Sequence, residues 1–146
     1  MTLTSSLLIA AVLLAAASAL GLLLRRSAGR ARVVRPSAGA VLPSDIGAPA
    51  LGERATLVQF STELCSGCPA ARRLLGEIAA ASPGVRHVDV DVTFRRDLAG
   101  RFNLLQSPTT LVLDGSGTIV ARIGGVPRRD VVLNELAKTD SAVSAR

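Results

Sequence analysis

The segment ATLVQFSTELCSGCPAARRLLGEIAA, residues 55–80, joins a strand-like run to a helix-like run through the only two cysteines of the chain, Cys65 and Cys68. Its first part, residues 56–60, is short and apolar and contains β-branched side chains, which is typical of a buried strand. In its second part, apolar side chains recur at spacings of three and four, which predicts a helix that begins near Ser66. The apolar face of this helix consists of Ala71, Leu74, Leu75 and Ile78.

The sequence after this segment predicts three more strands and two more helices. Residues 85–92 (VRHVDVDV) alternate between apolar and polar side chains, which indicates a strand. Two further strands are expected at residues 108–113 and 118–123, joined as a hairpin by the turn DGSG. Phe94, Leu98 and Phe102 are spaced by four and suggest a helix. A last helix is expected over residues 128–138, with Val132, Leu133 and Leu136 on its buried face.

This order of elements predicts an α/β fold. Strands that are separated by helices are expected to pair in parallel through right-handed crossovers, while the hairpin adds an antiparallel edge. The expected result is a mixed sheet with helices on both faces.

An uncharged apolar stretch occupies the N-terminus, at residues 3–24. A helix of this length reaches about 33 Å, which is enough to cross the hydrocarbon core of a bilayer. A cleaved signal peptide is an alternative, but residues 1–6 carry no Lys or Arg, as its positive start would require. We therefore expect a permanent transmembrane anchor over residues 1–26.

A cluster of arginines follows this stretch and sets the expected orientation. Its members are Arg25, Arg26, Arg30, Arg32 and Arg35, and they account for most of the net charge of +6. Positive flanks stay in the cytoplasm, so the sequence favours an outward N-terminus and a cytoplasmic domain, with an extracytoplasmic domain as the alternative. No aromatic side chains interleave with the cluster, so we expect contact with lipid headgroups and no binding of nucleic acid.

The remaining boundaries follow from composition. Residues 27–52 are rich in Ala, Gly, Pro and Arg without a sustained period, which predicts a linker with a short ordered piece near the domain. The folded domain is expected over residues 53–139, and residues 140–146 are expected to form a flexible tail.

The spacing and position of the two cysteines indicate redox chemistry. The free N–H groups and partial positive charge at a helix N-terminus stabilise a thiolate, which is the nucleophile in disulfide exchange. Cys68 lies one turn from Cys65, close enough to attack a mixed disulfide formed there. Two alternatives stay open: a metal site, for which a single pair and one histidine supply too few ligands unless two chains share the metal, and inert thiols.

From Leu57 to about Gly125 the sequence resembles the thioredoxin superfamily. The stretch TLVQFSTELCSGC is similar to that family's strand followed by C-x-x-C, and residues 85–125 are similar to its second half. The resemblance implies a thioredoxin-like mixed sheet flanked by helices, and a disulfide Cys65–Cys68 that is redox-active without a further cofactor or metal. It also implies a cis peptide bond before Pro108, with Ser107, Pro108 and Thr109 forming a substrate groove beside the disulfide.

The chain departs from the family pattern at three places near the cysteines. Leu64 stands where thioredoxins carry Trp, and Ser66 and Gly67 stand where they carry Gly and Pro, so the resemblance implies no particular reduction potential. Gln59 aligns with a buried Asp that helps to move a proton. Since Gln cannot titrate, Glu63 is a candidate for proton transfer if its side chain turns inward; a solvated surface Glu is the alternative.

The polar face of the predicted strand at residues 85–92 includes two candidate functional residues, His87 and Asp91. His87, the only histidine, is either a partner near the disulfide or a partly buried structural residue, and the second reading is favoured. Asp91 is expected to cap the second helix.

These observations predict a membrane-anchored thiol–disulfide oxidoreductase, with Cys65 as nucleophile and Cys68 as resolving thiol. Its partners are expected to be protein dithiols or disulfides, and a reductase is the favoured direction. The alternative is a non-enzymatic binding module on the same fold, which either presents a docking surface near Cys65 and Pro108 or shares a metal between two chains through their cysteine pairs. The sequence identifies neither the substrate nor the electron donor.

Overall fold

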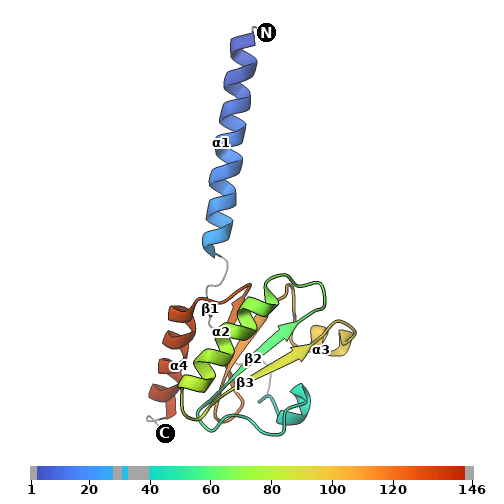
Figure 1. Ribbon diagram of the computed structural model, residues 1–146, viewed down its shortest axis with the longest axis vertical. Coiled ribbons are helices and arrows are strands. Elements are labelled where there is room, and N and C mark those ends of the chain that lie inside the picture. Colours follow the sequence, from blue (N-terminus) through green and yellow to red (C-terminus); the bar gives the residue numbers. More distant parts are fainter. Residues whose placement is uncertain (1–2, 28–30, 33–39, 144–146) are drawn as a thin grey trace.

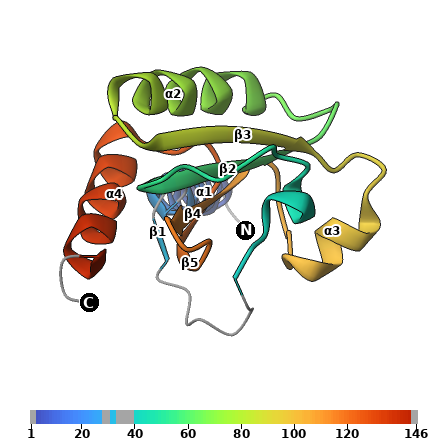
Figure 2. The same ribbon diagram turned by 90° about the horizontal axis from the view of Figure 1, so that it is seen from below.

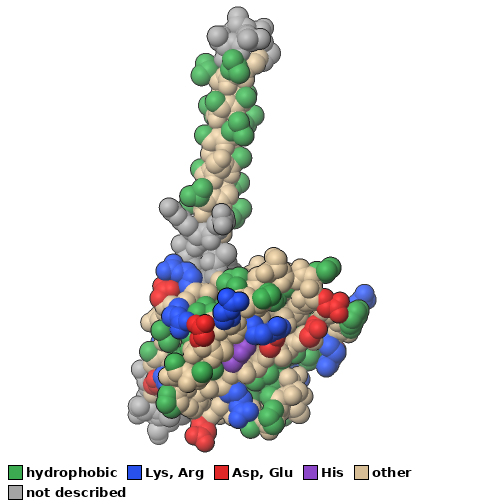
Figure 3. All heavy atoms as spheres, in the orientation of Figure 1, with side chains coloured by type: hydrophobic (Ala, Val, Ile, Leu, Met, Phe, Trp, Pro, Cys, Tyr) green, Lys and Arg blue, Asp and Glu red, His purple; other side chains and the backbone are tan. Residues whose placement is uncertain are grey.

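The structure, a computed structural model, describes residues 3–27, 31–32 and 40–143. An N-terminal helix, α1 (Leu3–Ser27), extends away from a mixed α/β domain (Figure 1). Within α1, the span from Ser5 to Leu24 is long and apolar enough to cross a membrane, and none of it is buried against the domain. Its surface in Figure 3 shows hydrophobic side chains and no charged ones along this span. A signal sequence near an N-terminus has the same properties.

The domain contains one five-stranded sheet in the order β1-β5-β4-β2-β3. Its strands are β1 (Ala31–Arg32), β2 (Ala55–Ser61), β3 (Val85–Asp91), β4 (Thr109–Asp114) and β5 (Ile119–Gly124). Its helices are the short 3-10 helix η1 (Pro43–Ile46), α2 (Cys68–Ala81), α3 (Arg96–Arg101) and α4 (Arg129–Val143). The mixed sheet with helices on both faces is the architecture that the sequence predicts, and each predicted strand and helix of the domain is present.

The direction of β4 differs from the prediction that helix-separated strands run in parallel. β2 and β3 are parallel, but β4 pairs antiparallel with β2, with Phe60 opposite Thr109. The cause is the shortness of α3. Its six residues span about 9 Å, whereas a return to the other end of a seven-residue strand needs about 23 Å. The chain therefore stays at the end of the sheet where β3 finishes, and β4 runs back from there.

The sheet separates two hydrophobic cores. Between the sheet and the pair α2 and α4, the core contains Leu57, Leu75, Ile78, Val112, Ile123, Val132 and Leu136. On the other face, α3 and η1 cover Val58, Phe60, Val90, Leu98, Phe102, Leu111 and Leu113. Figure 2 shows α2 and α4 on one side of the sheet and α3 on the other. The alternation of β2, with Leu57 on one face and Val58 on the other, explains why both faces of this strand are buried.

Two members of the predicted helical patterns are exposed. Phe94 is 85% exposed and precedes α3, because a turn at residues 93–94 separates β3 from the helix. Leu133 of α4 is 45% exposed, while Glu135, which Lys138 contacts at 2.7 Å, is 5% exposed. The other residues of the predicted apolar faces of α2 and α4 are buried or partly buried, as the three- and four-residue spacings predict.

The segment predicted as a linker contributes to the domain at its C-terminal end. Val41 and Ile46 are 2% and 5% exposed and belong to the core that α3 covers. Arg101 of α3 donates to both carboxylate oxygens of Asp45 at 2.7 and 2.9 Å, which fixes η1 beside α3. The ordered piece that the sequence predicts therefore begins by Val41. The predicted tail lies partly outside the described residues, and α4 continues to Val143.

Candidate active site

The two cysteines lie in and directly after the connection from β2 to α2. Cys65 precedes the helix and Cys68 is its first residue, so the predicted helix start near Ser66 is two residues early. The Cys65 N–H donates to the carbonyl of Thr62 at 3.2 Å, and the Cys68 N–H donates to the carbonyl of Cys65 at 3.3 Å. These tight turns, followed by Pro69 in the first helical turn where no N–H is needed, bring the two side chains together.

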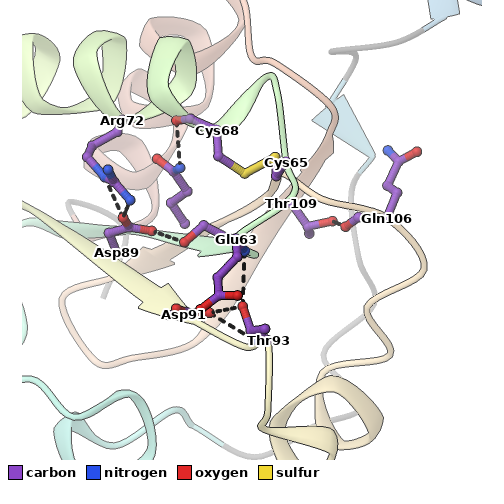
Figure 4. The surroundings of a disulfide bond; sticks show 11 residues. Glu63, Cys65, Cys68, Arg72, Asp89, Asp91, Thr93, Gln106 and Thr109 are labelled. Atoms are coloured by element: carbon purple, nitrogen blue, oxygen red, sulfur yellow. Dashed lines mark hydrogen bonds and ion pairs between the residues drawn. A yellow bond between two sulfur atoms is a disulfide. The ribbon is translucent and has the colours of Figure 1, made fainter.

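Cys65 and Cys68 form a disulfide, with sulfur atoms 2.05 Å apart and Cα atoms 5.4 Å apart (Figure 4). The two residues differ in access to solvent. Cys68 is 3% exposed, whereas Cys65 is partly exposed. An incoming sulfur atom can therefore reach Cys65 more easily than Cys68. The predicted roles, in which Cys65 attacks and Cys68 resolves, remain a prediction.

The peptide bond between Ser107 and Pro108 is cis, as the resemblance implies. A Cβ added at Gly67, between the cysteines, would lie 3.5 Å from Pro108 Cδ, so this proline packs against the disulfide loop. Of the predicted groove residues, Ser107 is exposed, while Pro108 and Thr109 are buried. The Thr109 hydroxyl donates to the carbonyl of Gln106 at 2.7 Å. The exposed part of the predicted groove is thus Ser107.

Val126 is a neighbour of the disulfide loop that the sequence did not identify. Its Cγ2 atom would lie 2.8 Å from a Cβ at Gly67, and the side chain is 43% exposed. The Gly124–Gly125 pair that ends β5 leads the chain to this place, and Gly125 has a φ of 77°. That glycine pair was the available signal, but it does not indicate which following side chain approaches the cysteines.

Gln59 lies beneath Cys68 and is completely buried. Its Nε2 donates to the carbonyl oxygen of Cys68 at 3.1 Å, which fixes the start of α2 against β2. Among the residues that the structure describes, the other amide atom, Oε1, has no hydrogen-bond partner, and neither does the hydroxyl of Thr110, which is opposite Gln59 on β4. Gln59 thus occupies a buried position next to the cysteines without supplying a group that titrates.

A polar network joins α2 to the sheet on the side of Cys68. Arg72 of α2 forms an ion pair with Asp89 of β3, and the Ser61 hydroxyl donates to the other oxygen of Asp89 at 2.8 Å (Figure 4). The Asp89 side chain is 20% exposed. The sequence did not predict this network, because Arg72 and Asp89 lie 17 residues apart on different elements.

The predicted role of Glu63 in proton transfer requires an inward side chain, but Glu63 does not turn inward. Its side chain is exposed, and its backbone N–H donates to the Thr93 hydroxyl at 3.0 Å. In Figure 4 Glu63 lies beside Thr93 and Asp91. Asp91 does not cap α3, contrary to prediction: its Oδ1 accepts from the Thr93 N–H at 2.8 Å and from the Thr93 hydroxyl. These bonds lower the pKa of Asp91 and shape the turn after β3.

His87 is remote from the disulfide. It is opposite Leu57 on β2, two residues before the Gln59 position, and its Nδ1 faces Gly76 in the middle of α2. Its Nε2 is buried and has no hydrogen-bond partner within the described part of the chain. Burial lowers the pKa of His87, and the charge of nearby Asp89 opposes this only in part. The structural reading of His87 therefore fits its position.

We expect His87 to make the folding stability depend on pH. Its neutral form is favoured in the fold, while an unfolded histidine titrates at about pH 6.5. The stabilisation that neutral His87 gives to the fold is therefore complete above that pH. It is lost progressively as the pH falls from about 6.5 toward the lower pKa of the folded state. Urea unfolding at pH 7.5 and 5.5 measures this loss. His87→Gln should reduce the difference between the two midpoints, and an equal difference in both proteins would contradict the assignment.

Within residues 3–27, 31–32 and 40–143, no group of three or more His, Cys, Asp or Glu side chains is arranged to hold a metal ion. The disulfide and the surrounding polar groups are thus the chemically distinctive features of this end of the sheet.

Searches against protein-family models and curated protein sequences find no match. Solved structures are similar. Chloroplastic thioredoxin z is 21% identical with a TM-score of 0.55, covering 61% of this chain and 80% of its own. Thioredoxin NaTrxh from Nicotiana alata is 23% identical with a TM-score of 0.52, and the match covers 60% of this chain and 74% of the thioredoxin. Oxidized mitochondrial thioredoxin 3 from Saccharomyces cerevisiae is 21% identical with a TM-score of 0.52, covering 59% and 79%.

These similarities show that the domain has the thioredoxin fold. They extend over about 60% of the chain. A thioredoxin-like fold with a C-x-x-C disulfide at the β2–α2 connection supports thiol–disulfide exchange as a general class of activity.

Proposed function

We propose that this thioredoxin-fold chain is a membrane-anchored thiol–disulfide oxidoreductase that reduces protein disulfides. The observation that carries the proposal is the disulfide between a partly exposed Cys65 and a buried Cys68, in a loop against which Pro108 packs. A disulfide serving only stability would gain little here, because closing so short a loop removes little entropy from the unfolded chain. The unequal exposure of the two cysteines instead suits a two-step exchange.

In the proposed reaction the reduced enzyme transfers two electrons to its substrate. The Cys65 thiolate attacks one sulfur of the substrate disulfide, a mixed disulfide forms, and the other substrate sulfur leaves as a thiolate that takes up a proton. Cys68 then loses its proton and attacks the Cys65 sulfur, which releases the second substrate thiol. The enzyme is left with the Cys65–Cys68 disulfide, and an external dithiol must reduce it before the next cycle.

The surroundings of the cysteines support particular steps. Cys65 is the more exposed residue of the pair, and exposed Ser107 precedes Pro108, which packs against the disulfide loop at Gly67. We propose that the backbone at Ser107 pairs with an extended substrate segment. The proton from Cys68 goes to water or to the departing thiolate, since Gln59 beneath it does not titrate. Glu63 is not assigned this role, because its side chain is exposed whereas Cys68 is buried.

Two measurements on the full-length chain in detergent test the proposal. We expect it to catalyse the reduction of insulin disulfides by dithiothreitol, and to do so without bound metal. Near-stoichiometric zinc that protects both thiols from alkylation would favour the binding-module alternative over exchange. Absence of catalysis in a metal-free, fully folded sample would overturn the proposed activity.

We place the domain in the cytoplasm, tethered by α1 as a single membrane span. Support comes from the length and apolar surface of α1 and from the arginines that follow it in the sequence. Cleavage as a signal sequence and an extracytoplasmic domain are the competing outcomes.

Labelling of the two cysteines distinguishes these outcomes, because the chain has no other thiols. After brief reduction, whole cells are treated with a membrane-impermeant maleimide, and the labelling is repeated on opened cells. We expect labelling only after opening, on a membrane-bound chain of full length. Labelling of intact cells would place the domain outside, and a shortened chain released from the membrane would show that α1 is removed.

A further inference from the structure

The point at which the chain enters the domain lies at the disulfide end of the sheet. Ala31, the first residue of β1, is opposite Ile123 on β5. Ile123 is opposite Thr110 on β4, and Thr110 is opposite Gln59 on β2. These four residues form one row across the sheet, and Gln59 contacts Cys68 at 3.1 Å. With strands about 4.8 Å apart, the entry point lies about 14 Å from the residue beneath the disulfide.

The connection to α1 is short. Ser27 ends α1 and Ala31 begins β1, so the two Cα atoms are at most about 14 Å apart whatever path the chain takes. From Ala31, β1 runs antiparallel to β5, toward the far end of the sheet. The far end, at the turn after β4, lies about 17 Å beyond the row of Ala31. In Figure 1 the loop between β2 and α2 lies on the side of the domain from which α1 rises.

Three large apolar side chains are exposed at this same end. Leu64 is 99% exposed, Leu105 is 86% exposed and Phe94 is 85% exposed. Leu64 precedes Cys65, Leu105 is in the loop before Pro108, and Phe94 follows Thr93, which bonds to the backbone of Glu63. We call these three side chains the apolar rim. Single exposed apolar side chains are common on protein surfaces, but three large ones at the end of the sheet that holds the disulfide indicate a docking surface.

Charged groups between the members of the apolar rim disfavour insertion into lipid. Glu63 and Asp91 are exposed close to Leu64, and Arg95 and Asp97 form an exposed ion pair after Phe94. Moving these charges into the bilayer core would cost several kcal/mol each. A protein surface, which offers apolar and polar groups together, suits this rim better than a lipid surface.

We propose that the disulfide end faces the membrane and that the substrate is a cysteine pair of an integral membrane protein, close to the bilayer surface. The proposal rests on the proposed function. The short tether holds the active site in a thin layer next to the bilayer. This position raises the local concentration of membrane-bound disulfides relative to soluble ones, although the active site can react with both. The substrate disulfide gains two electrons and two protons from the Cys65–Cys68 dithiol, which an external dithiol regenerates.

The orientation is tested without any redox activity. In the full-length chain carrying Cys65→Ser and Cys68→Ser, a single fluorophore is attached through Leu105→Cys or, as the control, through Glu53→Cys, which is exposed at the far end of the sheet. Both proteins are placed in phosphatidylcholine vesicles that contain lipids spin-labelled at the headgroup. We expect at least about threefold stronger quenching at position 105, because nitroxide quenching acts only over short distances. Equal quenching at both positions would overturn the orientation.

Lipids spin-labelled deep in the acyl chain identify what covers the apolar rim. We expect them to quench the fluorophore at position 105 less than headgroup labels do. Stronger quenching from the deep label would mean that the rim inserts into lipid, and would overturn docking of a protein substrate.

A longer tether tests the choice of substrate. Twenty Gly and Ser residues are inserted between Gly29 and Arg30, and reduction is measured in vesicles with two probes: soluble insulin and a single-span peptide with a disulfide at its membrane boundary. Insertion should leave the insulin rate unchanged and lower the peptide rate at least about fivefold, through the loss of effective concentration. Unchanged rates for both probes would overturn the proposed substrate class. If the native chain reduces neither probe, the proposed function fails, whatever the orientation measurement shows.

Discussion

Replacing Cys65 by Ser will abolish disulfide reduction, and the rate will fall at least about a hundredfold, to that of the uncatalysed reaction. The reason is chemical: a serine hydroxyl is not ionised near neutral pH and does not attack a disulfide sulfur, whereas a thiolate does. Cys65 is also the more exposed member of the pair, so Cys68 does not replace it as the entry point. Insulin reduction by the full-length chain in detergent, followed as turbidity, measures the loss.

The partner variant gives a different result that identifies the order of the two steps. With Cys68→Ser the first attack still takes place, but no second thiol is present to break the mixed disulfide. Substrates should therefore accumulate as covalent adducts of Cys65, visible as reducible bands of higher mass. Trapping by Cys65→Ser instead would reverse the assigned roles.

Ser66→Ala is the matched control in the same loop. Ser66 is exposed between the cysteines, and the variant keeps both thiols. We expect reduction within about twofold of the native rate, because the variant keeps both sulfur atoms that take part in the exchange and removes only an exposed hydroxyl. Near-native activity in Cys65→Ser would contradict the mechanism altogether.

The sequence predicted those elements of the fold that depend on local spacing. The alternation of Val88, Val90 and Val92 identified β3, and the three-four spacing of Leu75 and Ile78 identified the buried face of α2. These patterns are visible because each side chain's environment follows from the period of its own strand or helix. The cis bond before Pro108 was implied by resemblance alone, since the residues themselves equally allow a trans proline that begins a strand.

Predictions failed where a local turn, the length of a connection or a contact between distant segments decides the structure. Phe94 fits a helical spacing, but Asp91 bonds to Thr93 and makes a turn that ends the pattern before α3. The direction of β4 depends on the length of α3, which periodicity locates only to within a few residues. Val126 beside Gly67 and the ion pair of Arg72 with Asp89 join elements far apart in sequence, and a single sequence carries no signal for such contacts.

The largest effect on stability is expected at Phe60, in the middle of the core that α3 and η1 cover. The side chain is completely buried, and its ring centroid lies 5.1 Å from that of Phe102. Three phenylalanines are the only aromatic residues of the chain, so this pair is the bulkiest contact of an otherwise aliphatic core. Its loss leaves a cavity between β2 and the residue that ends α3, which smaller aliphatic neighbours cannot fill without moving the sheet.

Phe60→Ala should lower the free energy of unfolding by about 3–5 kcal/mol, the usual cost of emptying a buried aromatic site. Domains of this size are stable by about 5–15 kcal/mol, so the variant should be partly unfolded at moderate urea concentrations. Phe94→Ala, which removes the same ring from an 85% exposed position, should change the stability by less than about 0.5 kcal/mol. Urea titrations of the full-length chains in detergent, followed by circular dichroism, compare the two. Equal midpoints would show that Phe60 does not hold β2 and α3 together.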